Sequence, residues 1–185
     1  VASFGPSQNH PNFNHDQAAY FAALEQWQRE PGFIAATSPQ KKTTGTVLAF
    51  LTGAFGRQVR PARQEERELS PAVVRTIDHT TLHIDDHRAH TGWQISKLQK
   101  QFAWNVYLSV GDEGGETVVY GYSGYDGDML RRVPQVELRP ATGDLIVFNS
   151  GLVHQVKEST PKGQRITVNG QLAVYGDGDD IESCG

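Results

Sequence analysis

Cysteine is almost absent from this sequence of 185 residues, and the single example, Cys184, lies next to the C-terminus. One thiol can form neither an internal disulfide framework nor a thiolate metal cluster. This composition fits a reducing compartment, so we expect a cytoplasmic protein. The chain begins at Val1 rather than at a methionine, and we therefore expect an N-terminal segment to be missing from the sequence.

Two further absences limit the classes of partner. The formal net charge is −4, so no excess of positive charge is available to bind a nucleic-acid backbone. The short basic clusters at residues 41–42 and 131–132 are best interpreted as solvated surface. No apolar run approaches the length of a membrane span, and no secretory signal is visible. We expect no nucleic-acid partner and no membrane partner.

The residues that are present indicate a folded domain with many turns. The composition is 37% hydrophobic and 21% charged, with 19 glycines and 9 prolines. So many glycines and prolines favour short strands over a helical bundle. At this length we expect a single domain: residues 1–70 as a helical and irregular support, residues 73–175 as the β core, and residues 176–185 as an acidic, frayed tail.

Residues 14–29 have apolar side chains at helical spacing, among alanines that favour a helix. Asn14 is the expected N-cap, with Asp16 in the first turn, and Pro31 with the glycine after it ends the helix. We expect the aromatic side chains of this helix to pack on one face of a sheet rather than to bind a ligand.

Two segments between this helix and the β core are harder to assign. Residues 46–55 form a continuous apolar run that fits either a strand or a short buried helix. Residues 57–68 carry charges of both signs, which predicts a solvated connection or a surface helix.

From residue 73 onward the sequence is rich in β-branched and aromatic residues, interrupted by turn signals. The predicted strands are residues 73–77, 81–85, 102–109, 117–120, 135–138, 144–148, 152–156 and 165–174. Short strands that follow helical material predict a mainly β fold with flanking helices. The expected architecture is a double-stranded β-helix, a jelly roll of the cupin-like kind.

His83 and Asp85 are separated by one residue in the second of these strands. Because side chains two residues apart on a strand point to the same face, this pair can share one metal ion. A third ligand is needed, and His154 is the best candidate. Asp86 would leave a regular strand on the opposite face.

The order of the motifs resembles that of the Fe(II)/2-oxoglutarate-dependent oxygenases. In chain order the motifs are His83-x-Asp85, residues 105–109 followed by Gly114-Gly115-Glu116-Thr117, the strand 143–148, His154 and Arg165. The glycine-rich block is similar to that of the hydroxylases, in particular the prolyl-hydroxylase-like branch. The resemblance covers residues 73–175, and residues 1–70 align with nothing in it.

The resemblance implies a metal centre and a cosubstrate site. His83, Asp85 and His154 would bind Fe(II) and leave its opposite face open for 2-oxoglutarate and O2. Arg165 would hold the far carboxylate of 2-oxoglutarate with a bidentate guanidinium. The further candidate contacts with this cosubstrate are Thr167, Tyr107 and Asn105. The implied cofactors are Fe(II), 2-oxoglutarate and O2, with ascorbate as a candidate additional reductant.

The implied reaction is oxidative decarboxylation of 2-oxoglutarate to succinate and CO2, coupled to hydroxylation of an unactivated C–H bond. Related halogenases have glycine or alanine in place of the carboxylate ligand. Asp85 retains the carboxylate, which favours hydroxylation over halogenation. The preferred substrate is a small molecule or an amino-acid derivative. A protein substrate, such as a prolyl side chain, is the alternative within the superfamily.

Each candidate residue also has a purely structural interpretation. His83 and His154 can be ordinary histidines of the fold, and Arg165 can pair with Glu158 or Asp144 on the surface. We expect the loop histidines to be solvated rather than to line a substrate entrance. We expect the tryptophans to pack in the core and the two residues after the glycine pair to be structural. These residues are His79, His87, His90, Trp93, Trp104, Glu116 and Thr117.

Two functions of other kinds compete with this interpretation. A cupin-type metal-dependent protein has the same kind of fold, although the His-x-His pair of such proteins is absent from this sequence. A non-catalytic sugar- or ligand-binding jelly roll would hold a structural ion in the same three residues.

Overall fold

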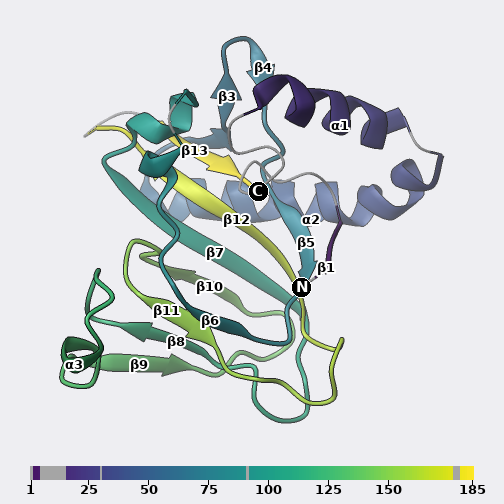
Figure 1. Cartoon of the computed structure of the whole chain (residues 1–185). Helices are drawn as coiled ribbons and strands as arrows, with labels where there is room; N and C mark the ends of the chain where they lie inside the picture. Colours follow the sequence, from purple (N-terminus) through teal and green to yellow (C-terminus); the bar gives the residue numbers. More distant parts are fainter. Residues whose placement is uncertain (1, 5–15, 30, 91, 177–179) are drawn as a thin grey trace.

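The computed structural model describes residues 2–4, 16–29, 31–90, 92–176 and 180–185, and within these ranges two β-sheets form the body of the protein (Figure 1). The larger sheet has seven strands: β1 (Ala2–Phe4), β2 (Val59–Pro61), β5 (Val73–Thr76), β7 (Lys100–Ser109), β10 (Leu145–Phe148), β12 (Ile166–Val174) and β13 (Ile181–Cys184). The smaller sheet has four: β6 (Thr80–His83), β8 (Thr117–Tyr120), β9 (Gln135–Leu138) and β11 (His154–Val156). A separate hairpin contains β3 (Arg63–Gln64) and β4 (Arg67–Glu68).

The chain passes back and forth between the two sheets. Strands β5, β7, β10 and β12 belong to the larger sheet, and the strands between them along the chain (β6, then β8 and β9, then β11) belong to the smaller one. Neighbouring strands in both sheets are antiparallel, except for the parallel pair of β13 and β2. This arrangement is a double-stranded β-helix, and the predicted fold class is confirmed.

Strand β12 lies at the centre of the larger sheet. It pairs with β7 along its whole length, and on its other side with β5 and then with β13. Its alternating side chains separate two environments. Val168 and Leu172 belong to the core beneath a helix, whereas Asn169 and Gln171 line a cavity between the sheets.

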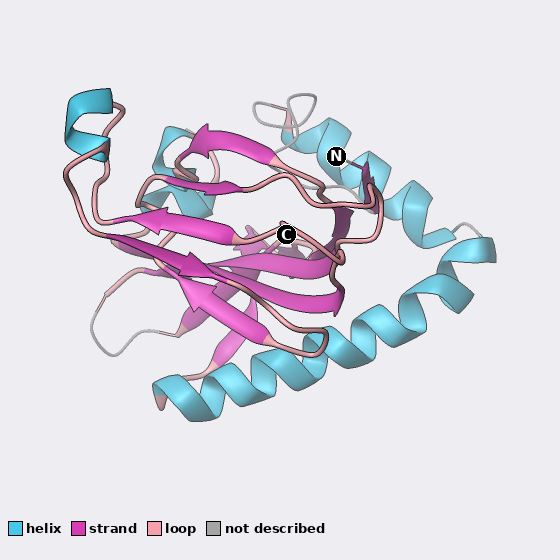
Figure 2. Cartoon of the chain, turned by 90° about the horizontal axis from the view of Figure 1, so that it is seen from below, coloured by secondary structure: helices cyan, strands magenta, loops and turns pink. Residues whose placement is uncertain are grey.

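Helix α2 (Pro31–Phe55) lies along the outer face of the larger sheet (Figure 2). Val47, Leu48 and Leu51 are buried against Trp104 and Leu172 of that sheet. These helix residues occupy positions i, i+1 and i+4, which share one helical face. The apolar run at residues 46–55 is therefore helical, because its apolar side chains meet the sheet at this spacing. Burial of a side chain of this size contributes about 1.5–3 kcal/mol.

Helix α1 (Gln17–Arg29) begins directly after Asp16. The Asp16 carboxylate accepts a hydrogen bond of 2.8 Å from the backbone N–H of Ala19, as an N-cap does. The cap predicted at Asn14 lies outside the described residues. The helix ends at Arg29, and α2 begins at Pro31, so the predicted stop is confirmed.

The segment between β6 and β7 contains two short 3-10 helices, η1 (His87–Ala89) and η2 (Gln94–Lys97). Trp93 and Ile95 in this segment are buried against Tyr20 and Phe21 of α1. The Tyr20 and Trp93 rings meet edge to face at 5.5 Å. The predicted packing role of Trp93 is confirmed. A further short helix, α3 (Gly127–Leu130), joins β8 to β9.

Two predictions for the ends of the β core are wrong. Residues 57–68, predicted as a solvated connection or a surface helix, contain the three short strands β2, β3 and β4, and Val59, Ala62 and Gln64 are buried while the charged residues between them remain outside. The last residues are not frayed. Residues 181–184 form β13 between β12 and β2, with Ile181 and Cys184 buried.

Among the helices described, none has both the length and the apolar character needed to cross a membrane.

Candidate active site

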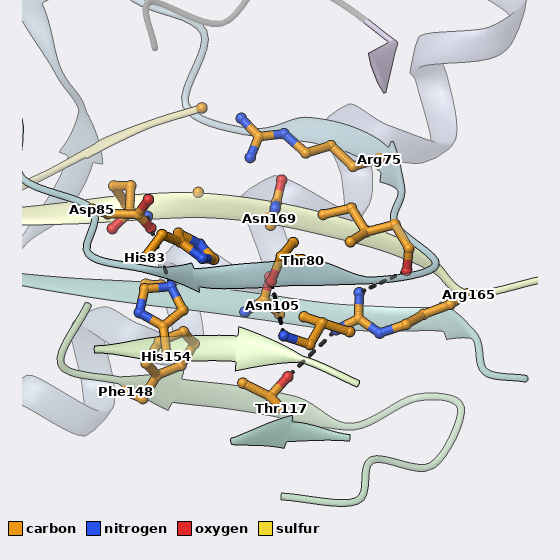
Figure 3. Close-up of a pocket in the computed structure, with 16 residues that line it drawn as sticks. Arg75, Thr80, His83, Asp85, Asn105, Thr117, Phe148, His154, Arg165 and Asn169 are labelled. Atoms are coloured by element: carbon orange, nitrogen blue, oxygen red, sulfur yellow. Dashed lines mark hydrogen bonds and ion pairs between the residues drawn. The ribbon is translucent and has the colours of Figure 1, made fainter. Parts of the chain in front are cut away.

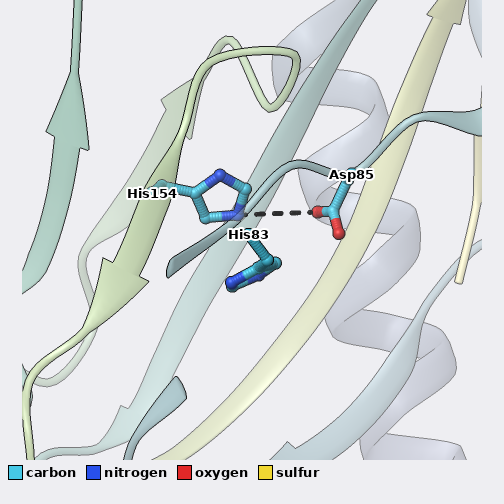
Figure 4. Close-up of side chains that lie close together, drawn as sticks. All are labelled: His83, Asp85 and His154. Carbon is cyan, nitrogen blue, oxygen red and sulfur yellow. Dashed lines mark ion pairs between the residues drawn. The ribbon is translucent and has the colours of Figure 1, made fainter. Parts of the chain in front are cut away.

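Three potential metal ligands come together where β6 and β11 meet. His83 and His154 are direct partners in the antiparallel pair of these strands, and Asp85 follows two residues after His83. One ligand atom from each of the three residues can be chosen so that all lie within 4.8 Å of one another (Figure 4). The structure therefore brings together all three residues that the sequence singled out as metal ligands.

Both histidines are oriented by a backbone carbonyl oxygen two residues earlier in the chain. Nδ1 of His83 lies 2.7 Å from the carbonyl oxygen of Thr81, and Nδ1 of His154 lies 2.9 Å from that of Leu152. A carbonyl oxygen only accepts hydrogen bonds, so each Nδ1 carries the proton. In the neutral ring each Nε2 then has a free lone pair, which is the state that a metal ion requires.

Burial lowers the pKa of His154, and the nearby His83 lowers it further, whereas the Asp85 carboxylate opposes the shift. Nε2 of His154 lies 3.7 Å from Oδ2 of Asp85. Because a lowered pKa keeps the imidazole neutral at physiological pH, His154 is prepared to donate its lone pair rather than to form an ion pair.

Asp85 lies beyond the end of β6 and is held by residues of other segments. Its backbone N–H donates to the carbonyl oxygen of Ser150 at 3.1 Å. Its Oδ2 accepts a hydrogen bond of 2.6 Å from Nε2 of Gln171 on β12. By contrast, Asp86 turns away and caps η1, where its carboxylate accepts from the backbone N–H of Arg88. The predicted separation of the two neighbouring aspartates is confirmed.

The three residues open onto a cavity of about 150 Å³ between the two sheets (Figure 3). The side chains that β12 contributes to the wall are polar, whereas the smaller sheet contributes both polar and apolar side chains. Besides the three potential ligands, the polar side chains in this wall belong to Arg75, Thr80, Asn105, Thr117, Arg165, Asn169 and Gln171.

Arg165 is 97% buried, in the wall of the same cavity. Its Nε donates to the carbonyl oxygen of Gly115 at 3.2 Å, and its Nη2 lies 3.4 Å from the hydroxyls of Tyr107 and Thr117. Among the described residues, no carboxylate lies within ion-pair distance of this guanidinium. Burial lowers the pKa of Arg165, and an anion in the cavity would compensate for the buried charge.

The surface ion pairs considered for Arg165 do not form. Glu158 lies 3.5 Å from Lys162 instead, and the Asp144 carboxylate accepts from the backbone N–H of Ala141.

The other predicted cosubstrate contacts occupy different positions around Arg165. Asn105 lines the cavity and lies directly opposite Asn169 in the β7–β12 pair. Tyr107 is fully buried, and its hydroxyl joins Thr117 to Arg165. Thr167 is also fully buried, and within the described part of the chain its hydroxyl has no hydrogen-bond partner, but the residue is not part of the cavity wall.

The glycine pair before β8 is required by close packing. Gly114 and Gly115 both have positive φ, of 71° and 75°. A Cβ at Gly114 would lie 1.8 Å from the carbonyl oxygen of Glu158, and one at Gly115 would lie 3.3 Å from Cδ of Arg165. The block therefore holds the Arg165 side chain in place. Glu116 is structural, as expected, because it accepts two hydrogen bonds from Arg139.

Several residues of the site were not identified from the sequence. Asn169 and Gln171 share a face of β12 with Thr167, so the period of two along that strand was the signal that pointed to them. Arg75 lies within β5, and nothing in the sequence of this strand distinguishes it from a solvated arginine. The expectation for His87 is wrong, because this histidine is 99% buried and not solvated. Trp104 packs in the core as predicted.

Comparisons with known proteins agree with this geometry. The two-sheet fold is that of metal-dependent oxygenases built on the double-stranded β-helix, and the chain belongs to the 2OG-Fe(II) oxygenase superfamily, whose family model matches residues 71–173. The predicted family is confirmed. The protein is a 2-oxoglutarate-dependent oxygenase, and its cofactors are Fe(II) and 2-oxoglutarate, as predicted.

Among curated relatives, an L-gamma-glutamyl-L-propargylglycine hydroxylase of Streptantibioticus cattleyicolor is 30% identical over 95% of this chain and 74% of its own length. A leucinostatins biosynthesis cluster protein S of Purpureocillium lilacinum is 26% identical over 60% of this chain and 54% of its own length. The crystal structure of an N-substituted L-amino acid dioxygenase from Burkholderia ambifaria has a similar fold. Its TM-score is 0.57, with 18% identity over 86% of this chain and 75% of its own length.

Proposed function

We propose that this protein is a hydroxylase of an amino-acid-derived small molecule, and that residues 1–185 act as one oxygenase domain. The observation that carries the proposal is a single cavity that contains two histidines, a carboxylate and a buried arginine. When bound, Fe(II) and 2-oxoglutarate supply the oxidation of an unactivated C–H bond with O2, and succinate and CO2 are released. The residues of the chain hold, orient and shield the reacting groups.

His83, Asp85 and His154 are the proposed iron ligands. Two imidazoles and one carboxylate form the ligand set of non-haem Fe(II) oxygenases, and they leave positions open for other ligands. The hydrogen bonds at both Nδ1 atoms support this role, because they direct each Nε2 toward the shared site. The carboxylate of Asp85 favours hydroxylation over halogenation, which would need that position for a halide.

Arg165 is the proposed partner of the far carboxylate of 2-oxoglutarate. Its guanidinium is buried in the cavity wall, and its hydrogen bonds reach neutral oxygens only among the described residues. A planar guanidinium offers two parallel N–H donors to a carboxylate. Asn105, in the cavity wall, is the proposed additional contact with the cosubstrate, and Tyr107 supports the guanidinium of Arg165 through its hydroxyl. Thr167 lies outside the wall and is not retained as a contact.

Arg75 is the proposed receptor for a carboxylate of the substrate. It extends from β5 into the same cavity and gives the wall a second guanidinium (Figure 3). Burial lowers the pKa of Arg75, and the Asp85 carboxylate opposes the shift. With Arg165 assigned to the cosubstrate, Arg75 adds a second positive charge to the wall of the same cavity. An amino-acid derivative carries such an anion, and the hydroxylase of S. cattleyicolor is named for a substrate of this kind.

The test is succinate release from protein supplied with Fe(II), 2-oxoglutarate and O2, together with a panel of L-amino acids and their γ-glutamyl derivatives. Each panel member is also supplied as the C-terminal amide. We expect succinate to depend on the substrate, and the product to gain one oxygen atom from isotopically labelled O2. Arg75→Gln should remove the preference for the free acid over the amide, mainly through KM, and should leave the KM for 2-oxoglutarate near the wild-type value.

Asp85→Ala is the control for the metal centre and should abolish succinate release with every panel member. Hydroxylation of a prolyl peptide with no response to the small molecules would replace our proposal with the protein-hydroxylase alternative. Failure of all substrates to release succinate, together with binding of an ion in a closed four-coordinate site, would favour a ligand-binding jelly roll.

A further inference from the structure

A chain of buried hydrogen bonds ends on the carboxylate of Asp85. Gln101 of β7, Ser150 in the loop between β10 and β11, and Gln171 of β12 are connected side chain to side chain. The exposed fractions of these residues are 5%, 0% and 9%. Four hydrogen bonds run from the backbone of His87 to the potential metal ligand through these three side chains.

The direction of this chain is fixed at its start. The backbone N–H of His87 can only donate, and it donates to Oε1 of Gln101 at 3.2 Å. Gln101 must therefore present its NH2 group to the next residue, and Nε2 lies 3.2 Å from Oγ of Ser150. The Ser150 hydroxyl accepts this bond, so its single proton points to Oε1 of Gln171, which is 2.8 Å away.

The same logic fixes the amide of Gln171. Because its Oε1 accepts from Ser150, its NH2 group must point to Asp85, where Nε2 lies 2.6 Å from Oδ2. A flipped amide would place Oε1 of Gln171 against Oδ2 of Asp85, and would turn its NH2 group toward the Ser150 hydroxyl, whose proton would then lose its acceptor. The chain therefore delivers an N–H donor to a carboxylate oxygen of Asp85.

Ser150 controls Asp85 in a second way. Its carbonyl oxygen accepts the backbone N–H of Asp85 at 3.1 Å, while its hydroxyl orients Gln171. Asp85 lies beyond the end of β6, so the pairing of β6 with β11 that sets the spacing of the two histidines does not fix it. One buried serine thus holds both the backbone and the side chain of this residue.

We infer that Gln171 is a positioning residue for the metal centre, and that Gln101 and Ser150 fix its amide so that Asp85 is presented to the metal in one orientation. The inference rests on the proposed role of Asp85 as an iron ligand. A partner of a ligating carboxylate contributes to metal affinity by holding the ligand in its binding orientation, and its loss typically lowers that affinity by about 10–100-fold.

The experiment measures the affinity of the metal-free protein for Co(II) alone by absorption titration, so that it does not depend on turnover. Gln171→Met keeps the length of the side chain and removes its hydrogen bonds. We expect this variant to bind Co(II) about 10–100-fold more weakly than the wild type. Ser150→Ala should give a smaller loss in the same direction, because the amide of Gln171 remains but is no longer oriented.

Gln155→Met is the matched control. Gln155 is next to His154, and its amide donates to the hydroxyl of Tyr120 at 3.0 Å, but it takes no part in the chain to Asp85. We expect Co(II) affinity to stay within about twofold of the wild type in this variant, since surface-type changes away from a site are usually near neutral. Equal losses in Gln155→Met and Gln171→Met would overturn the inference.

The Asp85→Ala background separates positioning from general packing. If Gln171 acts through Asp85, adding Gln171→Met to Asp85→Ala should not weaken Co(II) binding further. An equal further loss in that background would show that Gln171 acts through the fold and would contradict the inference. If Asp85→Ala itself binds Co(II) as tightly as the wild type, the proposed iron site fails. If Asp85→Ala loses affinity while Gln171→Met does not, only the positioning role fails.

Discussion

His83 and His154 lie directly opposite each other across the antiparallel pair of β6 and β11, with ring centroids 4.1 Å apart. Each ring is also anchored by the carbonyl oxygen of the residue two positions earlier in the chain, Thr81 within β6 or Leu152 just before β11. Cross-strand pairing sets the spacing of the two rings, and the local carbonyls set their orientation. Two of the three proposed ligands are thus preorganised by the β-sheet itself.

We expect His83→Ala to lower substrate-dependent succinate release more than about 100-fold, since loss of a direct ligand exceeds the typical effect of losing a partner of a ligand. His79→Ala is the matched control, because His79 is exposed and lies outside the cavity wall. Parallel assays of succinate release and Co(II) affinity check the prediction. Wild-type activity in His83→Ala would exclude His83 as a ligand.

Arg165→Lys should raise the KM for 2-oxoglutarate by about 10-fold or more, because lysine keeps the charge but loses the planar pair of donors. Arg165→Gln should raise it further, because the charge is also lost. The Arg165 side chain also donates to Gly115, so the unfolding temperature of each variant is measured alongside the kinetics. A change in the KM for the substrate, with the KM for 2-oxoglutarate unaltered, would show that Arg165 binds the substrate and would contradict its proposed role.

The sequence was most informative where local pattern and tertiary structure agree. The β-branched and aromatic residues of three segments correctly predicted β6, β7 and β12, the strands that carry His83, Asn105 and the segment after Arg165. The fold class followed from the number and spacing of such strands. The period of a strand also placed Asp85 near His83, although Asp85 lies beyond the end of β6 and is directed by Ser150 and Gln171.

The features that the sequence did not predict depend on long-range packing. Residues 46–55 are helical because the larger sheet offers an apolar face to Val47 and Leu51. The acidic segment near the C-terminus becomes β13 because its backbone completes the sheet between β12 and β2. Arg75 and His87 carry no local signal that separates a buried polar residue from a solvated one, since their burial is created by segments far away in the chain.

Gly114→Ala should destabilise the protein by more than about 3 kcal/mol, as a strained backbone and a severe clash act together. The φ of 71° is unfavourable for alanine, and its Cβ would meet the carbonyl oxygen of Glu158 at 1.8 Å. Gly163→Ala is the control, because Gly163 has a φ of 83° but open space around its Cβ position. Urea unfolding should show a loss of only about 1–2 kcal/mol for Gly163→Ala. If Gly114→Ala and Gly163→Ala lose equal stability, backbone strain alone explains the need for glycine at position 114.

His87 should make the metal-free protein less stable in acid. Burial lowers the pKa of His87 to about 4, with the nearby Asp85 opposing the shift, and neither ring nitrogen has a hydrogen-bond partner among the described residues. The unfolded chain binds a proton here near pH 6.5, whereas the folded protein does so only near pH 4. Stability is therefore unaffected above pH 6.5 and falls as the pH drops between these values, by up to about 3 kcal/mol.

Urea unfolding of the metal-free protein at neutral pH and near pH 5 measures this loss. His87→Leu should reduce the difference between the free energies of unfolding measured at the two pH values. The substitution removes the titrating group and keeps the apolar surroundings. His154 also has a lowered pKa and acts with the same sign, so a smaller pH dependence should remain in the variant. His79→Leu makes the same substitution at an exposed histidine and is the matched control. If the free energy of unfolding depends on pH equally in His87→Leu and in the wild type, the imidazole of His87 does not resist protonation in the folded protein.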